Sequence, residues 1–553
     1  MKKITGVLFA ILTLGLFGYI FVTAPNFNPL YADGVSFWAG VITLYVGLYA
    51  LLKTGELTFN KLTGGGGNPI AYVHTAKFPK WAIAVIAIPW AYIIVMTVLF
   101  SPIFFSNSYR DQLGVAEIKT FDSEIQAIDT SQIPIVDEQL ARKLAEKKLG
   151  ERPSLGSQTM IGIPTIQSVN NKLVWAVPLH HSGFFKWLMN MEGTPGYIIV
   201  SATNVNDVDY VEGHKLKYHP TSFLLHDAQR YVRFKEGLFT GLKDYSFELD
   251  DNGVPYWVIT TYKNRIGFNL PEATGAILLN ATTGETTKHT IDDIPKWVDR
   301  VQPEDFVVHQ INNQGEFVHG IFNFSNKDKF QTSAGHNIVY NNGHCYLFTG
   351  LTSVGADESA LGFIMVDMVT KQSHRYQFSG ATELAAMRSA EGKVQNLRYS
   401  ATFPIILNIA NQPTYFMTLK DDEGLIKQYA MVSVVNYSSV GTGETMQAAI
   451  QDYQKSLKND GLSNDIGATV ENKSITGVVA RIAPEVNENN TVYKLILEED
   501  LSKIFVVEAA ASDELALTQI GDKVSVSYIE SGDGVKMATE FDNVQFKQEA
   551  SVK

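Results

Sequence analysis

A single cysteine, Cys345, occurs among the 553 residues, which excludes an internal disulfide and a cysteine-rich metal site. Positive charge is also scarce. Lys and Arg number 45 against 57 Asp and Glu, so the formal net charge of -12 offers no overall positive field for nucleic acid. Compositional bias is missing as well. With 43 Gly, 19 Pro and 11% aromatic residues, the chain is neither disordered nor collagen-like, and its length allows several domains.

Charge is absent from three long apolar runs near the start of the chain, Ile4–Val22, Val35–Leu52 and Trp81–Phe100. Each run is long enough to cross a hydrocarbon layer of about 30 Å at about 1.5 Å per residue. Three such runs in the first hundred residues favour transmembrane helices over buried core helices. We therefore expect three membrane spans.

The basic residues around these runs predict the orientation. They are Lys2, Lys3, Lys53, Lys61, Lys77 and Lys80, and the loop at 23–34 has none. By the positive-inside bias, the N-terminus and the second loop lie in the cytoplasm. We expect a multi-pass protein of the inner or plasma membrane whose region after Phe100 lies outside the cytoplasm. If Ile4–Val22 were instead a cleaved signal peptide, the exit side would be the same.

The region after the spans repeats a pattern of two strands. Three segments share a glycine, a short β-rich run, a polar residue and a turn: Gly196–Asn204, Gly275–Glu285 and Gly362–Gln372. Each follows another strand-like stretch: Leu173–Leu179, Pro255–Thr261 and His344–Thr349. A fourth pair, Pro413–Leu419 and Gln428–Val435, has the same rhythm. Helical patterns at Asp137–Leu149, Asp227–Phe234 and Ala381–Ala390 complete an α+β plan.

These units resemble the PepSY domain, which occurs in metallopeptidase propeptides and in membrane-anchored envelope proteins. The best match runs from Val254 through Asn280 to Gly284 and Glu285. The third copy has Asp367 but carries Lys371 in place of the turn glycine. The resemblance covers about residues 130–460 and implies a module that binds or regulates other envelope proteins, without implying catalysis.

Five strand-like runs follow Asn472, with a short helical segment, Asp513–Leu517, between the third and fourth. This order predicts an OB-fold-like barrel. Acidic residues outnumber basic ones between Glu471 and Lys547, and few aromatic residues are available for stacking. We therefore expect a protein-contact module and no nucleic acid. The polar stretch Tyr453–Asp465 is interpreted as the linker before it.

Five parts follow from these patterns. Residues 1–105 hold the membrane helices, 106–215 and 216–320 the first and second PepSY-like repeats, 321–460 the third and fourth strand pairs, and 466–547 the barrel.

Motifs for chemistry are sparse. His180 and His181 precede Ser182, but adjacent residues of a strand point to opposite faces, so we interpret them as polar hairpin residues. The apolar segment Phe184–Met191 either packs in the core, which we favour, or enters the membrane interface.

A second group of polar residues lies between Trp297 and Gly320. It contains Asp305 with His309 and Glu316 with His319 at helical spacing, a weak signal for metal. Asp299 and Arg300 suggest a structural ion pair. The acidic pairs Asp250-Asp251 and Asp421-Asp422 precede Asn252-Gly253 and Glu423-Gly424, and are interpreted as hairpin turns.

The sequence thus predicts no catalytic, cofactor-binding or metal-binding residue. The expected function is a non-enzymatic scaffold that is anchored among membrane lipids and binds envelope or virion partners. Its hairpin edges are the candidate docking surfaces, and a homo-oligomer is a further expected form. Two alternatives stay open: a regulator or inhibitor of an extracytoplasmic peptidase, and an envelope hydrolase with an unrecognised site.

Overall fold

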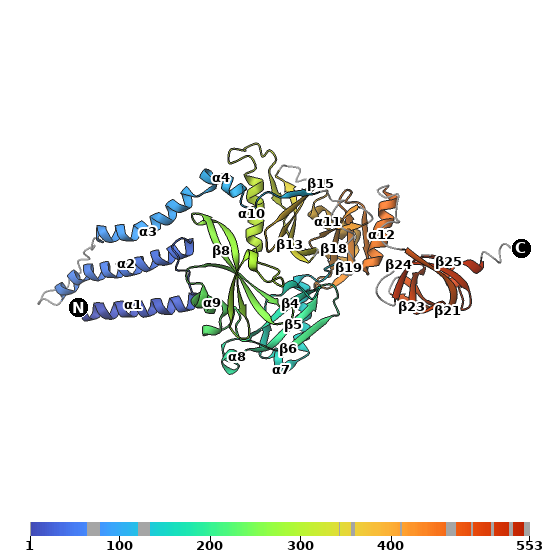
Figure 1. The fold of residues 1–553 in the computed structure, drawn as a ribbon, viewed down its shortest axis with the longest axis horizontal. Helices are drawn as coiled ribbons and strands as arrows, with labels where there is room; N and C mark the ends of the chain where they lie inside the picture. The colour runs from blue at the N-terminus through green and yellow to red at the C-terminus, as the bar shows by residue number, and fades with distance from the viewer. Residues whose placement is uncertain are drawn as a thin grey trace. The chain divides into compact units, whose positions relative to one another are not determined.

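The computed structural model describes residues 2–62, 78–119, 133–341, 343–354, 360–409, 412–460, 472–487, 490–509, 512, 514–529 and 535–546 (Figure 1). The described residues form two compact units. The first unit reaches Leu384, and the second begins at Ala385.

The first unit begins with three long apolar helices, α1 (Lys2–Thr23), α2 (Ala32–Leu62) and α3 (Lys80–Leu99). Each is long and apolar enough to cross a membrane, with candidate spans at Thr5–Thr23, Ala32–Lys53 and Lys80–Leu99. Most of their large apolar side chains are exposed, as expected for a surface that contacts lipid. The three apolar runs predicted from the sequence are therefore helices of the expected length.

The helix ends at Thr23, Ala32 and Leu99 all lie against the rest of the first unit, which we call the body (residues 102–384). Arg230 donates from Nε to the carbonyl of Phe21 at 2.5 Å and from Nη2 to that of Val22 at 3.2 Å. The loop between α1 and α2 joins the body through Phe27 N and the Leu238 carbonyl, 2.9 Å apart. After α3, the Phe100 carbonyl accepts from Asn269 Nδ2 at 3.1 Å.

Shorter helices accompany the sheets of the body. They are α4 (Pro102–Arg110), α6 (Glu138–Gly150), α7 (Pro153–Gly156), α8 (Phe184–Met189), α9 (Ala228–Glu236) and α10 (Glu304–Glu316), with 3-10 turns η2 (Leu224–His226) and η3 (Ile291–Asp293). Helix α6 begins where the sequence predicts, because Asp137 caps it by accepting from Leu140 N at 2.9 Å. Asp227 caps α9 in the same way, at 2.8 Å from Arg230 N.

Two antiparallel sheets come first in the body (Figure 1). The first sheet contains β2 (Thr159–Ile161), β3 (Thr165–Val169), β4 (Lys172–His181), β5 (Thr194–Ser201) and β6 (Val208–Leu216), in the order β2-β4-β5-β6 with β3 also on β4. The second sheet contains β7 (Gly241–Leu249), β8 (Pro255–Ile266), β9 (Asn269–Asn280) and β10 (Thr286–Thr290), in the order β10-β9-β8-β7. One apolar core joins both sheets to α9, with Tyr197, Val232, Phe247 and Trp257 almost fully buried.

The third sheet has the order β1-β15-β14-β13-β11, with β12 also on β13. Its strands are β1 (Glu117–Lys119), β11 (Phe330–Thr332), β12 (Asn337–Asn341), β13 (His344–Ser353), β14 (Ala360–Asp367) and β15 (Ser373–Gly380). Strand β1 pairs in parallel with β15, which places Glu117 opposite His374. Val307 and Ile311 of α10 pack on this sheet.

The second unit contains a fourth sheet and the C-terminal strands, after α11 (Glu383–Lys393) and η4 (Gln395–Leu397). The fourth sheet has the order β16-β18-β19-β20, with β17 also on β18: β16 (Ser400–Ala401), β17 (Ile405–Ile409), β18 (Gln412–Lys420), β19 (Ile426–Ser433) and β20 (Val440–Gly443). Helix α12 (Met446–Asn459) buries Tyr453 and Leu457. The prediction of a linker beginning at Tyr453 is therefore wrong up to Asn459, because this stretch supplies the apolar face of a helix.

The last strands form a separate closed barrel in the order β21-β22-β23-β25-β24. They are β21 (Asn472–Asn487), β22 (Asn490–Leu497), β23 (Asp500–Glu508), β24 (Lys523–Ile529) and β25 (Val535–Asn543), with the turn η6 (Leu515–Leu517) before β24. Strands β23 and β25 are parallel, and β24 pairs with β21. Val479, Leu495, Phe505 and Val526 fill the interior.

Candidate functional site

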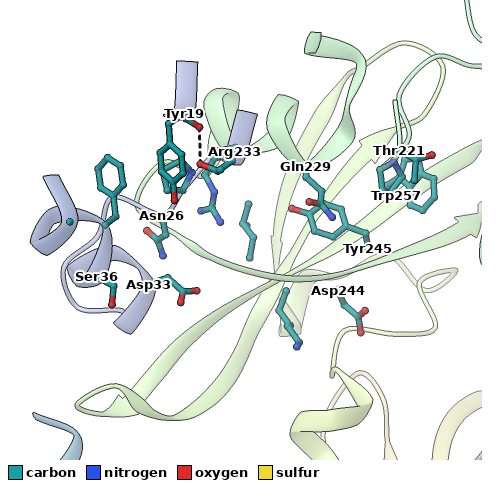
Figure 2. Close-up of a pocket in the computed structure, with 18 of the residues that line it drawn as sticks. Tyr19, Asn26, Asp33, Ser36, Thr221, Gln229, Arg233, Asp244, Tyr245 and Trp257 are labelled. Carbon is teal, nitrogen blue, oxygen red and sulfur yellow. Dashed lines mark hydrogen bonds between the residues drawn. The ribbon is translucent and has the colours of Figure 1, made fainter. Parts of the chain in front are cut away.

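A cavity of about 1470 Å³ lies between the body and the ends of α1 and α2. Its lining comes from α1, α2 and the connection between them, from α6, β4 and the residues around β2, from the loop before η2, and from α9, β7 and β8. Figure 2 shows Asp33 and Ser36 on the α2 side and Arg233, Gln229 and Tyr245 on the body side of this space. A cavity of this volume exceeds the usual range for a drug-sized ligand, about 300–1000 Å³.

The wall formed by α1 and α2 is apolar. The two helices meet where Thr13 Oγ1 lies 2.7 Å from Tyr45 OH. Nearer the body they leave space between them, and this part of the cavity is lined by Leu12, Gly15, Leu16, Tyr19, Phe37, Gly40, Val41 and Leu44. A Cβ atom added at Gly15 or Gly40 would meet nothing within 4 Å. The glycines thus widen the space between the helices.

The body side of the cavity is polar. It includes Arg233 of α9, whose guanidinium is held by two backbone carbonyls. Its Nη1 donates to the carbonyls of Gly237 at 2.5 Å and Thr240 at 2.6 Å. Burial lowers the pKa of Arg233, whereas electrostatic interaction with the nearby Tyr245 and Asp33 raises it. The carboxylate of Asp33 lies at the start of α2 and lines the same space. The cavity therefore presents both signs of charge beside an apolar wall.

A bulge in β7 supplies three more lining residues, Lys243, Asp244 and Tyr245. The pairing of β7 with β8 shifts register between Lys243 and Ser246, and Asp244 has a φ of 58°. This left-handed backbone turns the Asp244 side chain out of the regular strand pattern. Lys243 pairs with Asp305 at 2.8 Å. Burial raises the pKa of Tyr245 to about 12, so its hydroxyl remains protonated at neutral pH.

His180 lies at the inner end of the cavity, beside Thr221 and Trp257. Its Nδ1 is 2.9 Å from Thr221 Oγ1, and its ring stacks on that of His219 with centroids 4.6 Å apart. Within the described residues, His180 Nε2 is buried without a hydrogen-bond partner. Burial lowers the pKa of His180 to about 4, with a further contribution from His181. The ring is therefore uncharged at neutral pH.

Three further histidines extend this group. His181 Nδ1 lies 3.0 Å from His219 Nε2, and His181 Nε2 lies 3.0 Å from the carbonyl of Asn190. His226 Nδ1 accepts from Trp187 Nε1 at 3.1 Å. Burial lowers the pKa of all three, so they form a neutral network.

The interpretation of His180 and His181 as polar hairpin residues is thus wrong, because both are almost fully buried. The expectation that Ser182 faces away from His181 agrees with its exposed position. Among the described residues, none of the hydrogen bonds to the rings of His180, His181, His219 and His226 involves a carboxylate. A base with a pKa near 4 also accepts protons weakly at neutral pH, so this arrangement favours binding over proton transfer.

A second buried polar group lies between the three sheets of the body. Glu248 Oε2 accepts from Asp299 N at 2.9 Å, and Asp299 Oδ2 accepts from Ser168 N at 2.7 Å and from Tyr340 OH at 3.0 Å. Burial, with help from the Asp299 carboxylate, raises the pKa of Glu248 to about 8. Burial also raises the pKa of Asp299 to about 6.

Arg300 completes this group by donating to Glu304 Oε1 at 2.8 Å. The predicted direct pairing of Asp299 with Arg300 is therefore replaced by separate partners. Because Glu248, Asp299, Ser168 and Tyr340 come from different sheets and connections, their hydrogen bonds join the sheets. The group serves the packing of the body.

The residue pairs considered as weak metal signals are not brought together as ligands. Asp305 pairs with Lys243, and Glu316 pairs with Lys329 at 2.7 Å. His319 Nε2 lies 2.7 Å from Asp328 Oδ2. His309 is exposed. Among the residues that the structure describes, no group of three or more His, Cys, Asp or Glu side chains fits a metal ion.

Both acidic pairs are found in turns, as predicted. Asp250 Oδ1 accepts from Asn252 N and Val254 N, each at 2.8 Å, between β7 and β8. Asp421 Oδ1 accepts from Leu425 N at 2.8 Å between β18 and β19. These carboxylates fix hairpins.

Exposed apolar side chains gather on and beside helix α8. We call this group the α8 patch: Phe184, Phe185, Leu188 and Met189 of α8, Met191 just after it, and Leu224 and Leu225 of η2. The preference for core packing of Phe184–Met191 is correct only for Trp187, which is 1% exposed, whereas Phe185 is 76% and Met189 88% exposed. Arg230 holds the Leu224 carbonyl as well as those at the end of α1. The patch therefore lies next to a segment that is hydrogen-bonded, through Arg230, to the end of α1.

The sequence interpretation missed the residues of the cavity. One signal was available, because Asp33 is the only acidic residue before Glu56 and stands beside an apolar run. Such an isolated charge at the edge of a membrane span often has a functional role. Arg233 gave no signal, since its proximity to Asp33 arises only from the fold.

No family model matches the chain, and no curated protein matches it. Among solved structures, the crystal structure of a levansucrase mutant from B. megaterium aligns with 77% of this chain and 96% of its own, at 9% identity and a TM-score of 0.18. A TM-score this low carries no argument about fold or function.

Proposed function

We propose that the protein is a membrane-anchored scaffold or interaction protein whose body and C-terminal modules lie outside the cytoplasm and act without catalysis. The observation that carries this proposal is the attachment of the body to the ends of all three candidate spans, at Val22, Phe27 and Phe100. Three crossings leave the N-terminus and the body on opposite sides of a bilayer. The lysines near the N-terminus and between α2 and α3 favour the cytoplasm as the side of the N-terminus, which leaves the body outside the cytoplasm.

The modules themselves support an interaction role. The strand pairs β4–β5, β8–β9, β13–β14 and β18–β19 are antiparallel, in agreement with a PepSY-like interpretation. The barrel order, with β23 parallel to β25 and β24 closing onto β21, supports an OB-like interpretation. We assign both as contact modules for other envelope or membrane proteins, or for a second copy of the chain.

Strand β6 is the candidate docking edge. It pairs with β5 on one side and ends the order of the first sheet on the other. Its exposed positions include Asp209, Glu212 and Lys215, which discourage unspecific strand pairing but allow a partner with matching charges. The α8 patch is assigned to the membrane interface, beside the end of α1.

The sidedness is tested by labelling single cysteines with a membrane-impermeant maleimide in right-side-out vesicles. Burial raises the pKa of the native Cys345 thiol well above its usual value, so the unmodified chain serves as an unlabelled blank. We expect Ser182→Cys in the body to react directly and Phe78→Cys, before α3, to react only after permeabilisation. The reverse pattern would refute the orientation.

The interaction role is tested with a photoreactive residue at Asp209 on β6 and a matched one at the exposed turn residue Asp251. We expect crosslinking in intact cells to capture one defined membrane or envelope protein, or a second copy of the chain, from Asp209 but not from Asp251. A captured peptidase, inhibited by the purified protein, would select the regulator alternative. Equal and diffuse capture from both positions would contradict a docking edge at β6.

The envelope-hydrolase alternative keeps one observation in its favour, the contact of His180 with the Thr221 hydroxyl inside a cavity. If Thr221 were a nucleophile, Thr221→Val would abolish turnover of a lipid-ester probe, while Thr221→Ser would retain it. We expect no turnover from the wild type either, because His180 is a weak base and no carboxylate among the described residues bonds to its ring.

A further inference from the structure

We propose that the cavity between α1, α2 and the body binds one membrane phospholipid with a zwitterionic head group, of the phosphatidylethanolamine type. The inference rests on α1 and α2 being membrane helices, which is part of the proposed function. It assigns the site a ligand class, which the scaffold role does not require.

The apolar end of the cavity fits acyl chains. Leu12, Leu16, Val41 and Leu44 line a space between two helices that meet farther down at Thr13 and Tyr45. Water in such a space would lack polar partners, because most of these walls are hydrocarbon. Lipid is the apolar molecule at hand beside two membrane helices.

The polar end of the cavity carries both positive and negative side chains, as a zwitterionic head group requires. Only Nη1 of Arg233 has protein acceptors among the described residues, so its Nε and Nη2 are available to a phosphate. Asp33, whose charge acts on Arg233, and Asp244 of the β7 bulge also line the cavity and are suited to an ammonium group. Arg142 and Lys243 add positive charge, but Lys243 is already paired with Asp305 and Arg142 with Glu138 at 3.7 Å. A purely anionic head group would meet both aspartates, and an uncharged one would leave Arg233 unmatched.

The polar and apolar ends meet at the depth where a lipid changes from chain to head group. Asn26 lies in the connection just after α1, and Asp33 lies in the first turn of α2 (Figure 2). The candidate spans end at Thr23 and begin again at Ala32. Asp33, together with Arg233 on which its charge acts, therefore stands at the level of the head groups.

The test uses the full chain in nanodiscs that contain equal amounts of phosphatidylethanolamine, phosphatidylglycerol and diacylglycerol. After transfer to mild detergent, native mass spectrometry measures the lipid retained on each protein. We expect one retained phosphatidylethanolamine per chain. Preferential retention of phosphatidylglycerol or diacylglycerol, or of none, would overturn the proposal.

Two variants locate the bound lipid. Gly40→Leu fills the apolar space, because nothing lies within 4 Å of its Cβ position, and Gly47→Leu is its matched control on the same helix, outside the cavity lining. We expect retention to fall at least tenfold in Gly40→Leu and to remain in Gly47→Leu. Arg233→Gln should lower retention of phosphatidylethanolamine more than that of diacylglycerol. Equal retention in Gly40→Leu and Gly47→Leu would exclude the cavity as the site.

Maleimide labelling of each variant separates this proposal from the proposed function. Ser182→Cys is labelled in the Gly40→Leu background. If it reacts from the same side as in the wild-type background while the lipid is lost, the site is supported independently of the scaffold role. If labelling shows that the helices do not span, the proposed function and the lipid site both fail. Correct labelling with no lipid retained by the wild type refutes the lipid site alone.

Discussion

At the scale of single residues, the buried carboxylates of Glu248 and Asp299 are the most unusual feature of the body. Each is held by backbone N–H groups, yet burial raises the pKa of Glu248 to about 8 and that of Asp299 to about 6. The body therefore folds most readily with both groups protonated. Since their ordinary values are 4.5 and 3.8, the folded state binds more protons than the unfolded state between those values and the raised ones.

This difference predicts a contribution to stability that is fully present below pH 3.8 and declines as the pH rises to about 6 for Asp299 and to about 8 for Glu248. Glu248→Gln should remove most of the Glu248 contribution, because the amide is isosteric and stays uncharged. Relative to the wild type, we expect the variant to gain on the order of 3 kcal/mol between pH 5 and pH 8, at about 1.4 kcal/mol per unit of pKa.

Urea unfolding of the detergent-solubilised chain at several pH values measures this gain. Glu212→Gln, on exposed β6, is the matched control and should follow the wild type. A constant offset between Glu248→Gln and the wild type at all pH values would show that Glu248 does not titrate in this range.

The sequence could not indicate these pKa shifts. Glu248 alternates with apolar residues in a strand and resembles a surface position, and Asp299 precedes an arginine that suggested a partner. Their burial arises from contact between sheets that are distant along the chain. His180 was misassigned for the same reason, because its neighbours Thr221 and His219 belong to another connection.

At the scale of single elements, local signals determine where the helices begin. Asp137 accepts from Leu140 N, and Leu140, Ala141 and Ala145 then form the buried stripe that the sequence predicts. Asp137→Ala should cost about 1 kcal/mol in urea unfolding, because one N–H of the first turn loses its acceptor. Asp137→Ser retains a capping oxygen and should lose only a fraction of this. Equal losses in both variants would mean that the cap is not the source of the effect.

Close packing of α12 on its sheet gives a second prediction. A Cβ at Gly441 of β20 would lie 2.1 Å from Tyr453 N, a backbone atom that cannot move without the helix. We expect Gly441→Ala to cost about 1–3 kcal/mol by overpacking.

Gly392 in α11 is the matched control for this substitution, because its Cβ position is open. Gly392→Ala should stabilise by about 0.5–1 kcal/mol, since alanine is the better helix former. Thermal unfolding that shifts in the same direction for both variants would contradict this account.

The elements most accessible to sequence reasoning are those with strong local periodicity. The three apolar runs, the capped helices and the four strand pairs are of this kind. The stretch from Tyr453 to Asn459 looked like a linker because its polar residues are frequent, whereas Tyr453 and Leu457 at helical spacing carry its packing. The Phe184–Met189 helix was also misjudged, because hydrophobicity alone does not distinguish a core from an exposed patch.

At the scale of the whole molecule, Arg230 links the body to the first candidate span, α1. Its guanidinium donates to Phe21 and Val22 at the end of α1 and to Leu224 of η2. The carbonyls of Phe21 and Val22 lie in the last turn of α1 and have no further helical turn to satisfy them, so a charged donor is worth about 1.5–3 kcal/mol for each hydrogen bond.

Arg230→Met should therefore lower the unfolding temperature of the detergent-solubilised protein by several degrees, roughly 2–4 °C per kcal/mol for a unit of this size. Arg152→Met is the control, because Arg152 forms an exposed pair with Glu212 that contributes little. A larger loss in Arg152→Met than in Arg230→Met would argue against the anchoring role of Arg230.

The parallel pairing of β1 with β15 has a consequence for how the protein is made. Glu117 leaves the ribosome soon after the last apolar helix, but its partner His374 is synthesised only after both intervening sheets. The third sheet therefore stays incomplete, with the β1 segment unpaired, while most of the body is translated. Nascent chains truncated before residue 373 should be readily cut by protease near this segment, and the completed chain should resist.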